Sequence, residues 1–222
     1  MWEPGQVRRR SGGGRPGALR PGFLLMRGMR VGLYGGSFNP AHEGHAHVAE
    51  TALRKLGLHR VLWLVSPQTP LKSRDQTRPL EQRLARVRAL ARGPGMIASD
   101  IEARLDTRFT LDTLLALKTR FPGVRFVWIM GADGLAGFHH WRGWRQIMRA
   151  LPVAVVARPP LSLKSRFSPA ARRFSSARLS TQRAPGLHDQ KPPAWIFLHG
   201  PLHFQSSTAL RETAAAESPR HG

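Results

Sequence analysis

Cysteine is absent from this chain of 222 residues, which excludes disulfides, thiolate metal sites, iron–sulfur clusters and a cysteine nucleophile. Long hydrophobic runs are absent as well, because no apolar stretch approaches the roughly 18 residues that a membrane-spanning helix needs. The apolar run near the start, Phe23 to Met26, is too short for the hydrophobic region of a secretion signal. We therefore expect a soluble protein of the cytoplasm that does not bind membranes.

Acidic residues are scarce. The chain has 13 Asp and Glu against 35 Lys and Arg, a formal net charge of +22. More than half of this excess lies in residues 1–30 (net +6) and 158–191 (net +7). Such a charge is typical of nucleic-acid-binding proteins, but the basic residues do not follow one helix and no aromatic RNA-binding string accompanies them. We expect nucleic acid to bind only nonspecifically, through the basic tails.

Composition also divides the chain. Residues 1–28 are rich in Gly, Arg and Pro without apolar periodicity, which predicts a disordered basic extension. Residues 158–193 hold six prolines among Ser and Arg, which predicts a mobile insertion in which Pro169 to Phe174 could form a short helix. We expect a single domain over 29–216 around this insertion, and a tail over 217–222.

Within this domain, apolar runs alternate with helical patterns. Strands are predicted over 30–34, 60–65, 96–98, 125–130, 152–157 and 195–198, and helices over 44–56, 80–91, 111–120, 141–150 and 207–216. This alternation predicts an α/β fold, a Rossmann-like doubly wound parallel sheet. Ligands of such sheets bind beyond the carboxyl ends of the strands, so the loops after Tyr34, Val65, Met130 and Leu198 are the candidates.

The loop after the first strand carries the strongest signal. It reads Gly35-Gly-Ser-Phe-Asn-Pro-Ala-His-Glu-Gly-His45. Glycines let the backbone approach a ligand closely, and the helix that begins near Gly44 offers free N–H groups to a phosphate. His42 and His45 can both point at the same anion. A Gly-rich turn with two surface histidines is the alternative, but the complete string between a strand and a helix favours a phosphate site.

These residues resemble the nucleotidyltransferase superfamily, whose hallmark is Gly-Ser-Phe-x-Pro-x-His-x-Gly-His. From Arg30 to Arg211 the chain resembles the bacterial nicotinate-nucleotide adenylyltransferases in particular. Further matches are Thr110 in a Phe-Thr-x-Asp-Thr string, a Gly-x-Asp after the fourth strand, and a Ser-Ser-Thr-x-x-Arg string near the end. The chain departs from the usual pattern at Asn39, where many members have Asp, at Phe109, where they have Tyr, and at Gln205, where they have Ile.

The resemblance implies the roles of individual residues. His42, His45 and Arg211 are the implied catalytic residues, which stabilise charge. The implied ATP site consists of Gly35, Gly36, Ser37, Phe38, Gly44, Gly131, Asp133, Ser206, Ser207 and Thr208. The implied mononucleotide site consists of Asn39, Lys72, Thr110 and Trp141. Structural alternatives stay open: Thr110 and the serines as helix caps, Lys72 as a solvated lysine, and Trp141 as a core residue.

The implied reaction is the joining of ATP and nicotinate mononucleotide into nicotinate adenine dinucleotide and pyrophosphate, a step of NAD biosynthesis. The mononucleotide phosphate would attack the α-phosphorus of ATP in line, so that the protein needs only to align the substrates and stabilise charge. Mg²⁺ is expected to arrive with ATP, without a metal site of the protein. The alternatives are a related enzyme such as a pantetheine-phosphate adenylyltransferase or a cytidylyltransferase, and a basic nucleic-acid-binding protein.

Overall fold

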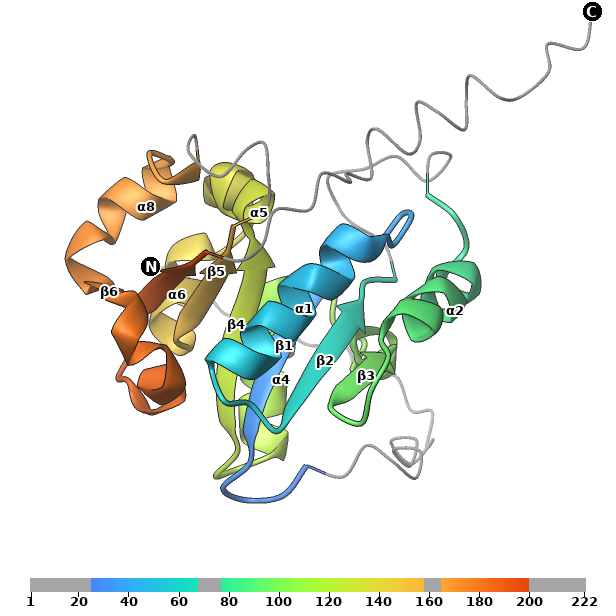
Figure 1. Cartoon of the computed structure of the whole chain (residues 1–222). Helices are drawn as coiled ribbons and strands as arrows, with labels where there is room; N and C mark the ends of the chain where they lie inside the picture. Colours follow the sequence, from blue (N-terminus) through green and yellow to red (C-terminus); the bar gives the residue numbers. More distant parts are fainter. Residues whose placement is uncertain (1–24, 68–76, 158–164, 200–222) are drawn as a thin grey trace, which may run out of the picture.

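The computed structural model describes residues 25–67, 77–157 and 165–199. These residues form a seven-stranded parallel sheet with the strand order β3-β2-β1-β4-β5-β7-β6, covered by helices on both faces (Figure 1). The predicted doubly wound α/β fold is therefore confirmed. In the described ranges, no helix is long and apolar enough to cross a membrane.

The six predicted strands are present close to the predicted residues, whereas α3, α5, β6 and the 3-10 helices were not predicted. The strands are β1 (Arg30–Gly36), β2 (Arg60–Val65), β3 (Met96–Ser99), β4 (Arg125–Gly131), β5 (Val153–Val156), β6 (Arg178–Leu179) and β7 (Trp195–Leu198). The α-helices are α1 (Glu43–Lys55), α2 (Leu80–Leu90), α3 (Ile101–Arg104), α4 (Thr110–Arg120), α5 (Ala132–Gly137), α6 (Trp144–Ala150) and α8 (Pro169–Arg173). The 3-10 helices are η2 (Phe138–His140), η3 (Ser175–Ala177) and η4 (Thr181–Asp189). The helix predicted over 207–216 lies outside the described residues.

One helix begins later than predicted. The pattern predicts a helix from Trp141, but α6 begins at Trp144 because Gly143 takes the left-handed conformation, with φ of 70°. This conformation suits glycine and ends regular helix geometry. Trp141 therefore lies in a turn outside α6.

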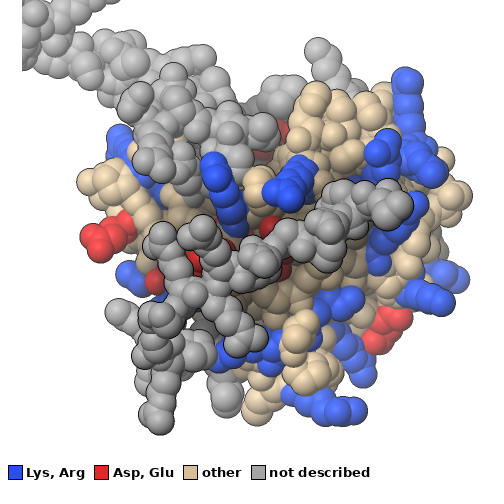
Figure 2. Space-filling model, turned by 180° about the vertical axis from the view of Figure 1, so that it is seen from behind, with Lys and Arg blue, Asp and Glu red and all other residues tan. Residues whose placement is uncertain are grey.

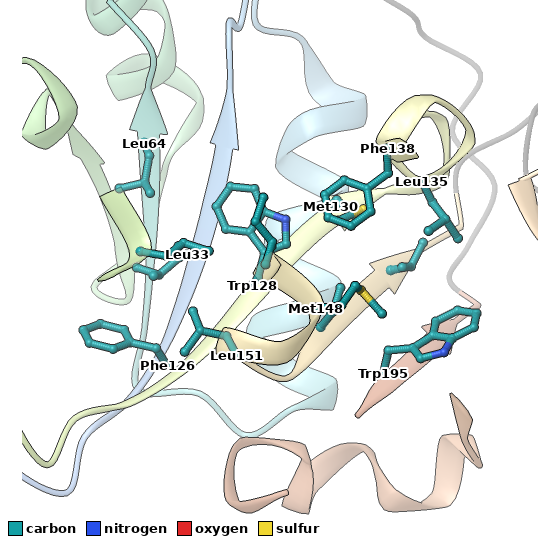
Figure 3. Close-up of a cluster of buried hydrophobic side chains, with 14 of the residues drawn as sticks. Leu33, Leu64, Phe126, Trp128, Met130, Leu135, Phe138, Met148, Leu151 and Trp195 are labelled. Carbon is teal, nitrogen blue, oxygen red and sulfur yellow. The ribbon is translucent and has the colours of Figure 1, made fainter. Parts of the chain in front are cut away.

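The sheet is buried on both sides because its strands alternate their side chains between two cores. On one face, Leu64, Trp128 and Trp195 belong to one core (Figure 3). Residues of α3, α4, α5, α6 and α8 complete this core. On the other face, Trp63 and Ile129 pack with α1, α2 and η4. Continuous apolar runs such as that of β2 follow from this double burial.

The chain reverses direction across the sheet at β1. It runs from β1 to β2 and β3, and then returns to pair β4 with the other side of β1. Gly36 lies opposite Val65, and Tyr34 lies opposite Ile129, so the loops after these three strands leave the same edge of the sheet. In open α/β sheets ligands bind at such a switch point, beyond the carboxyl ends of the strands.

The insertion predicted over 158–193 is no long surface loop over residues 165–193, which fold onto the sheet. This segment contains α8, η3, β6 and η4, and β6 extends the sheet by pairing with β7. Phe174 and Leu187 are buried in the two cores, and the Trp195 indole donates a hydrogen bond of 2.7 Å to the Phe174 carbonyl. The short helix expected near Pro169 is confirmed as α8. The scattered apolar residues of this segment find partners only in the tertiary fold.

The boundary expected at residue 28 is also slightly wrong. Leu25 is buried in the core, and the backbone N–H of Gly28 donates to the carbonyl of Gly123 at 2.8 Å. Since Leu25 packs in the core and Gly28 is hydrogen-bonded to the loop before β4, the folded domain begins no later than Leu25. Residues 1–24 lie outside the described part of the chain.

Candidate functional site

Two histidines form a reciprocal cap at the start of α1. His42 is the N-cap residue, and its Nδ1 accepts a hydrogen bond of 3.1 Å from the backbone N–H of Gly44. The Nδ1 atom of His45 accepts a hydrogen bond of 3.2 Å from the backbone N–H of His42. Because both Nδ1 atoms accept, each neutral ring must carry its proton on Nε2. The local fold therefore leaves the proton of each neutral ring on Nε2, with His42 itself buried and His45 half-buried.

Aromatic side chains hold this pair of histidines in place. The ring centroids of His42 and His45 are 4.0 Å apart, and the Phe38 ring meets the His45 ring edge to face at 5.1 Å. Phe38 also packs against Tyr34 and Trp63, each with ring centroids 5.4 Å away. Its backbone has a positive φ of 45°, which non-glycine residues rarely adopt. Because Phe38 as a whole is 2% exposed, its ring serves to support the histidine pair from the core side.

The glycines of this loop also have partners inside the protein. A Cβ atom on Gly35 would collide with the ring of the buried Trp128, and one on Gly36 would lie 3.2 Å from the Phe38 ring. Packing therefore requires a small residue at Gly35, whatever the ligand. Gly44 is buried in the first turn of α1, where its N–H donates to the capping side chain of His42.

A second cluster forms where α4 begins. The structure contradicts the interpretation of Thr110 as the cap, because Phe109 occupies the N-cap position and Thr110 is the first helical residue. The Arg142 guanidinium lies 4.3 Å from the centre of the Phe109 ring, a cation–π geometry. Gly143 packs against Leu111 so closely that a Cβ would come within 2.7 Å of its methyl group. Thr110 and the turn that contains Arg142 are therefore neighbours, although about 30 residues separate them in the sequence.

Trp141, in this same turn, is half-buried. It meets the Phe138 ring at 5.4 Å and the Trp128 ring at 6.3 Å, both edge to face. This position is compatible with Trp141 as a core residue and with Trp141 as a residue of the mononucleotide site, because the ring packs against the core and is still partly exposed.

A buried carboxyl group lies behind the second cluster. The hydroxyl of Thr113 on α4 donates to Glu102 at 3.5 Å and shares a hydrogen bond of 2.8 Å with Thr107. Glu102 also takes a hydrogen bond from the side chain of Ser66, which directly follows β2. Burial raises the pKa of Glu102 from 4.5 to about 7, against the lowering effect of these hydrogen bonds. Glu102 thus connects the end of β2 with the first turns of α4.

Sequence reasoning missed Glu102 and also Arg83, a second buried charged residue. Arg83 lies on α2, where its guanidinium donates to four backbone carbonyls of the described residues. One signal could have identified it: Arg83 follows Leu80 by three residues and precedes Val87 by four, so it lies on the apolar face of the helix. No comparable periodicity marks Glu102 in the short helix α3.

The other predicted site residues are placed as follows. Asn39 is buried, and its Oδ1 accepts from the backbone N–H of Arg78 at 3.2 Å, a bond that positions the loop. Gly131 ends β4, and the exposed Asp133 lies in the first turn of α5. Ser37 follows β1, and its carbonyl accepts from Arg83. Outside the described ranges lie Lys72, Ser206, Ser207, Thr208 and Arg211. The described residues contain no group of three or more His, Asp or Glu that could hold a metal ion.

Comparison with known proteins gives a consistent result. Residues 33–213 match the model of the family described as cytidylyltransferase-like. The chain is 65% identical over 183 residues to the "Probable nicotinate-nucleotide adenylyltransferase" of Caulobacter sp. (strain K31), covering 82% of this chain and 97% of the relative. It is 55% identical over 185 residues to the protein of the same name from Cereibacter sphaeroides (strain ATCC 17025 / ATH 2.4.3), covering 83% and 98%.

Solved structures agree in fold. The nicotinic acid mononucleotide adenylyltransferase of Plasmodium falciparum, complexed with NaAD, aligns with a TM-score of 0.62 at 15% identity, covering 86% of each chain. The same enzyme complexed with APC aligns with a TM-score of 0.61 at 14% identity, covering 86% of this chain and 87% of that one. At this level of identity, the likeness concerns the fold alone.

Proposed function

The chain belongs to the cytidylyltransferase-like family, among its nicotinate-nucleotide adenylyltransferases, and from that premise we propose how its residues carry out the reaction. The enzyme joins ATP to nicotinate mononucleotide, forming nicotinate adenine dinucleotide and releasing pyrophosphate. The observation that carries our proposal is the reciprocal cap of His42 and His45 at the switch point of the sheet. It combines two Nε2–H donors with the N-terminus of a 13-residue helix, a favourable setting for phosphate groups.

The chemistry needs no nucleophile from the protein. A phosphate oxygen of the mononucleotide attacks the α-phosphorus of ATP, a new P–O bond forms, and the bond to the β-phosphate oxygen breaks in line. Pyrophosphate leaves with the electron pair of that bond. His42 and His45 donate hydrogen bonds to the phosphate oxygens, on which negative charge is redistributed during the transfer. The loop of Gly35, Gly36, Ser37 and Phe38 lies against ATP through its backbone.

The nicotinate group binds in the second cluster. Thr110, free of a capping role, presents its hydroxyl and the first N–H groups of α4 to the nicotinate carboxylate. Trp141 stacks its exposed part on the pyridine ring. Arg142, held over the Phe109 ring, supplies positive potential beside Thr110. A carboxylate gains more from such donors than an amide, because charge-assisted hydrogen bonds are about twice as strong as neutral ones.

Several assignments depend on the family resemblance alone. Lys72 would contact the phosphate of the mononucleotide, and Ser206, Ser207, Thr208 and Arg211 would bind the ATP phosphates. Asp133 would hold a ribose or the adenosine. Nucleotidyltransferases of this kind use a metal with ATP, and Mg²⁺ would enter with ATP as part of the substrate, retaining water ligands. The cytoplasmic location stays a prediction.

Pyrophosphate release provides the test. We expect release from ATP with nicotinate mononucleotide, and at least about tenfold lower kcat/KM with nicotinamide mononucleotide. Equal values for the two mononucleotides would contradict the assignment of the second cluster but not adenylyl transfer. Release with phosphopantetheine in place of a pyridine nucleotide would favour the related adenylyltransferase instead.

The high positive charge also suggests nonspecific binding of nucleic acid as a secondary property. Lys and Arg side chains lie in several separate groups on the face shown in Figure 2. This distribution suits weak, salt-sensitive association with nucleic acid rather than one recognition surface. Filter binding of RNA with and without residues 1–28 would measure how much of this association belongs to the basic extension.

A further inference from the structure

Arg83 makes an unusual set of contacts for a buried cation. The residue is 2% exposed, and within the described part of the chain its guanidinium donates four hydrogen bonds, all to backbone carbonyls. These run from Nε to Arg78 (2.8 Å), from one terminal nitrogen to Ser37 (2.8 Å) and Ser66 (2.7 Å), and from the other to Pro67 (3.0 Å). The loss of water around the group lowers its pKa. Burying a charge is costly unless its hydrogen bonds are satisfied, and here the carbonyls satisfy them.

These four carbonyls belong to three separate segments. Ser37 follows β1 in the loop that ends at the histidine cap. Ser66 and Pro67 follow β2, in the loop that leads toward Lys72. Arg78 precedes α2, and its own N–H is tied to Asn39 in the first loop. A single side chain thus connects the loop expected to bind ATP with the loop expected to bind the mononucleotide phosphate.

The guanidinium group suits this connection better than any other side chain. It is planar and carries its donors in a fixed fork, so the carbonyls that it binds are held at fixed angles to one another. It also keeps the carbonyl groups of Ser37, Ser66 and Pro67 pointing toward a cation. Without this partner, their negative ends would be free to turn toward the anionic phosphates and repel them.

We propose that Arg83 is a positioning residue for adenylyl transfer, which holds the ATP loop and the mononucleotide loop at the separation that in-line attack requires. The proposal rests on the function of the two loops given above. Alignment is where such an enzyme gains most of its rate, and a misplacement of about 1 Å can cost about 100-fold. Arg83 acts through the backbone of the loops and touches neither substrate.

Two variants separate positioning from plain stability. Arg83→Ala removes all four bonds and leaves a space of guanidinium shape, whereas Arg83→Lys keeps a charge without the planar fork. Arg88→Ala is the matched control, because Arg88 is exposed on the same helix, α2. Activity is expressed per folded enzyme, with folding measured by circular dichroism and thermal melting.

We expect kcat to fall by about 100-fold in both Arg83 variants, while each KM changes by less than about fivefold, because each substrate still binds its own loop. Millimolar guanidinium should raise kcat of Arg83→Ala by at least about tenfold, while ammonium should not, since only the planar ion restores the fork. Arg88→Ala should match the wild type with or without guanidinium.

Three results would overturn the proposal: a wild-type kcat in a folded Arg83 variant, a loss seen entirely in one KM, or a failure of both variants to fold. The last would show that Arg83 serves the stability of the whole domain. An inactive wild type in the same assay would instead contradict the function of the enzyme.

Discussion

Replacing Glu102 with glutamine should abolish one large pH dependence of folding stability. Burial raises the pKa of this carboxyl group from 4.5 to about 7 in the folded protein. Between these values the folded protein keeps a proton that the unfolded chain has already released. The free energy of unfolding must therefore fall as the pH rises through this window. The stabilisation is complete below pH 4.5 and is lost once the pH passes about 7.

The size of this effect follows from the two pKa values. Their difference corresponds to about 3 kcal/mol, since one pKa unit is about 1.4 kcal/mol. Glutamine has nearly the shape of a protonated carboxyl group but does not titrate. The stability of Glu102→Gln relative to the wild type should therefore increase by about 3 kcal/mol between pH 4.5 and about pH 8.

Urea unfolding followed by tryptophan fluorescence measures this difference at each pH, and the other titrating groups cancel between the two proteins. Glu50→Gln is the control, because Glu50 is an exposed carboxylate in the middle of α1, away from either helix end. Its stability relative to the wild type should vary by less than about 0.5 kcal/mol over the same range, as is usual for surface substitutions. A Glu102→Gln difference that stays constant with pH would refute the account of this buried carboxyl group.

Three further predictions concern the site and the domain boundary. His45→Ala should lower turnover by about 100-fold in a folded protein, as expected for the loss of a charge stabiliser, and unchanged turnover in the pyrophosphate assay would remove His45 from the catalytic residues. Deleting residues 1–24 should leave activity and the melting temperature unchanged. Deleting residues 1–28 should lower the free energy of unfolding by about 1–3 kcal/mol, because it removes Leu25 from the core. Equal melting temperatures of the two truncated proteins would contradict a domain boundary before Leu25. Arg142→Gln should lower the ratio of kcat/KM for nicotinate mononucleotide to that for nicotinamide mononucleotide by at least about threefold. The control is Arg145→Gln, which should keep the wild-type ratio because the Arg145 guanidinium lies over Trp144 instead. An unchanged ratio in Arg142→Gln would argue against a role of Arg142 in selecting the acid.

The sheet could be predicted from the sequence because its signal is local. The run of β2, from Arg60 to Val65, is continuous in apolar residues and can only be satisfied between two layers of helices. The candidate site has a local signal of the same kind. In the string from Gly35 to His45, glycines, histidines and the start of a helix are neighbours in sequence as well as in space.

Sequence patterns misplaced the first residues of two helices, α4 and α6. Thr110 has the chemistry of a helix cap, but α4 begins one residue earlier, with Phe109 at the cap position beneath Arg142. Trp141 fits the start of a helix, but Gly143 turns the chain and delays α6. In both places contacts between α4 and the turn before α6 decide the conformation, and these contacts join residues about 30 positions apart.

By itself, then, the sequence determined the main strands and helices, the edge of the sheet proposed to bind substrates, and the histidine pair, because each depends on neighbouring residues. Only the tertiary structure decided that residues 165–193 would fold onto the sheet, and that Arg83 and Glu102 would be buried beside the candidate site. Polar and charged side chains are usually solvated. Their burial here depends on carbonyls, hydroxyls and apolar surfaces that distant segments of the folded chain supply.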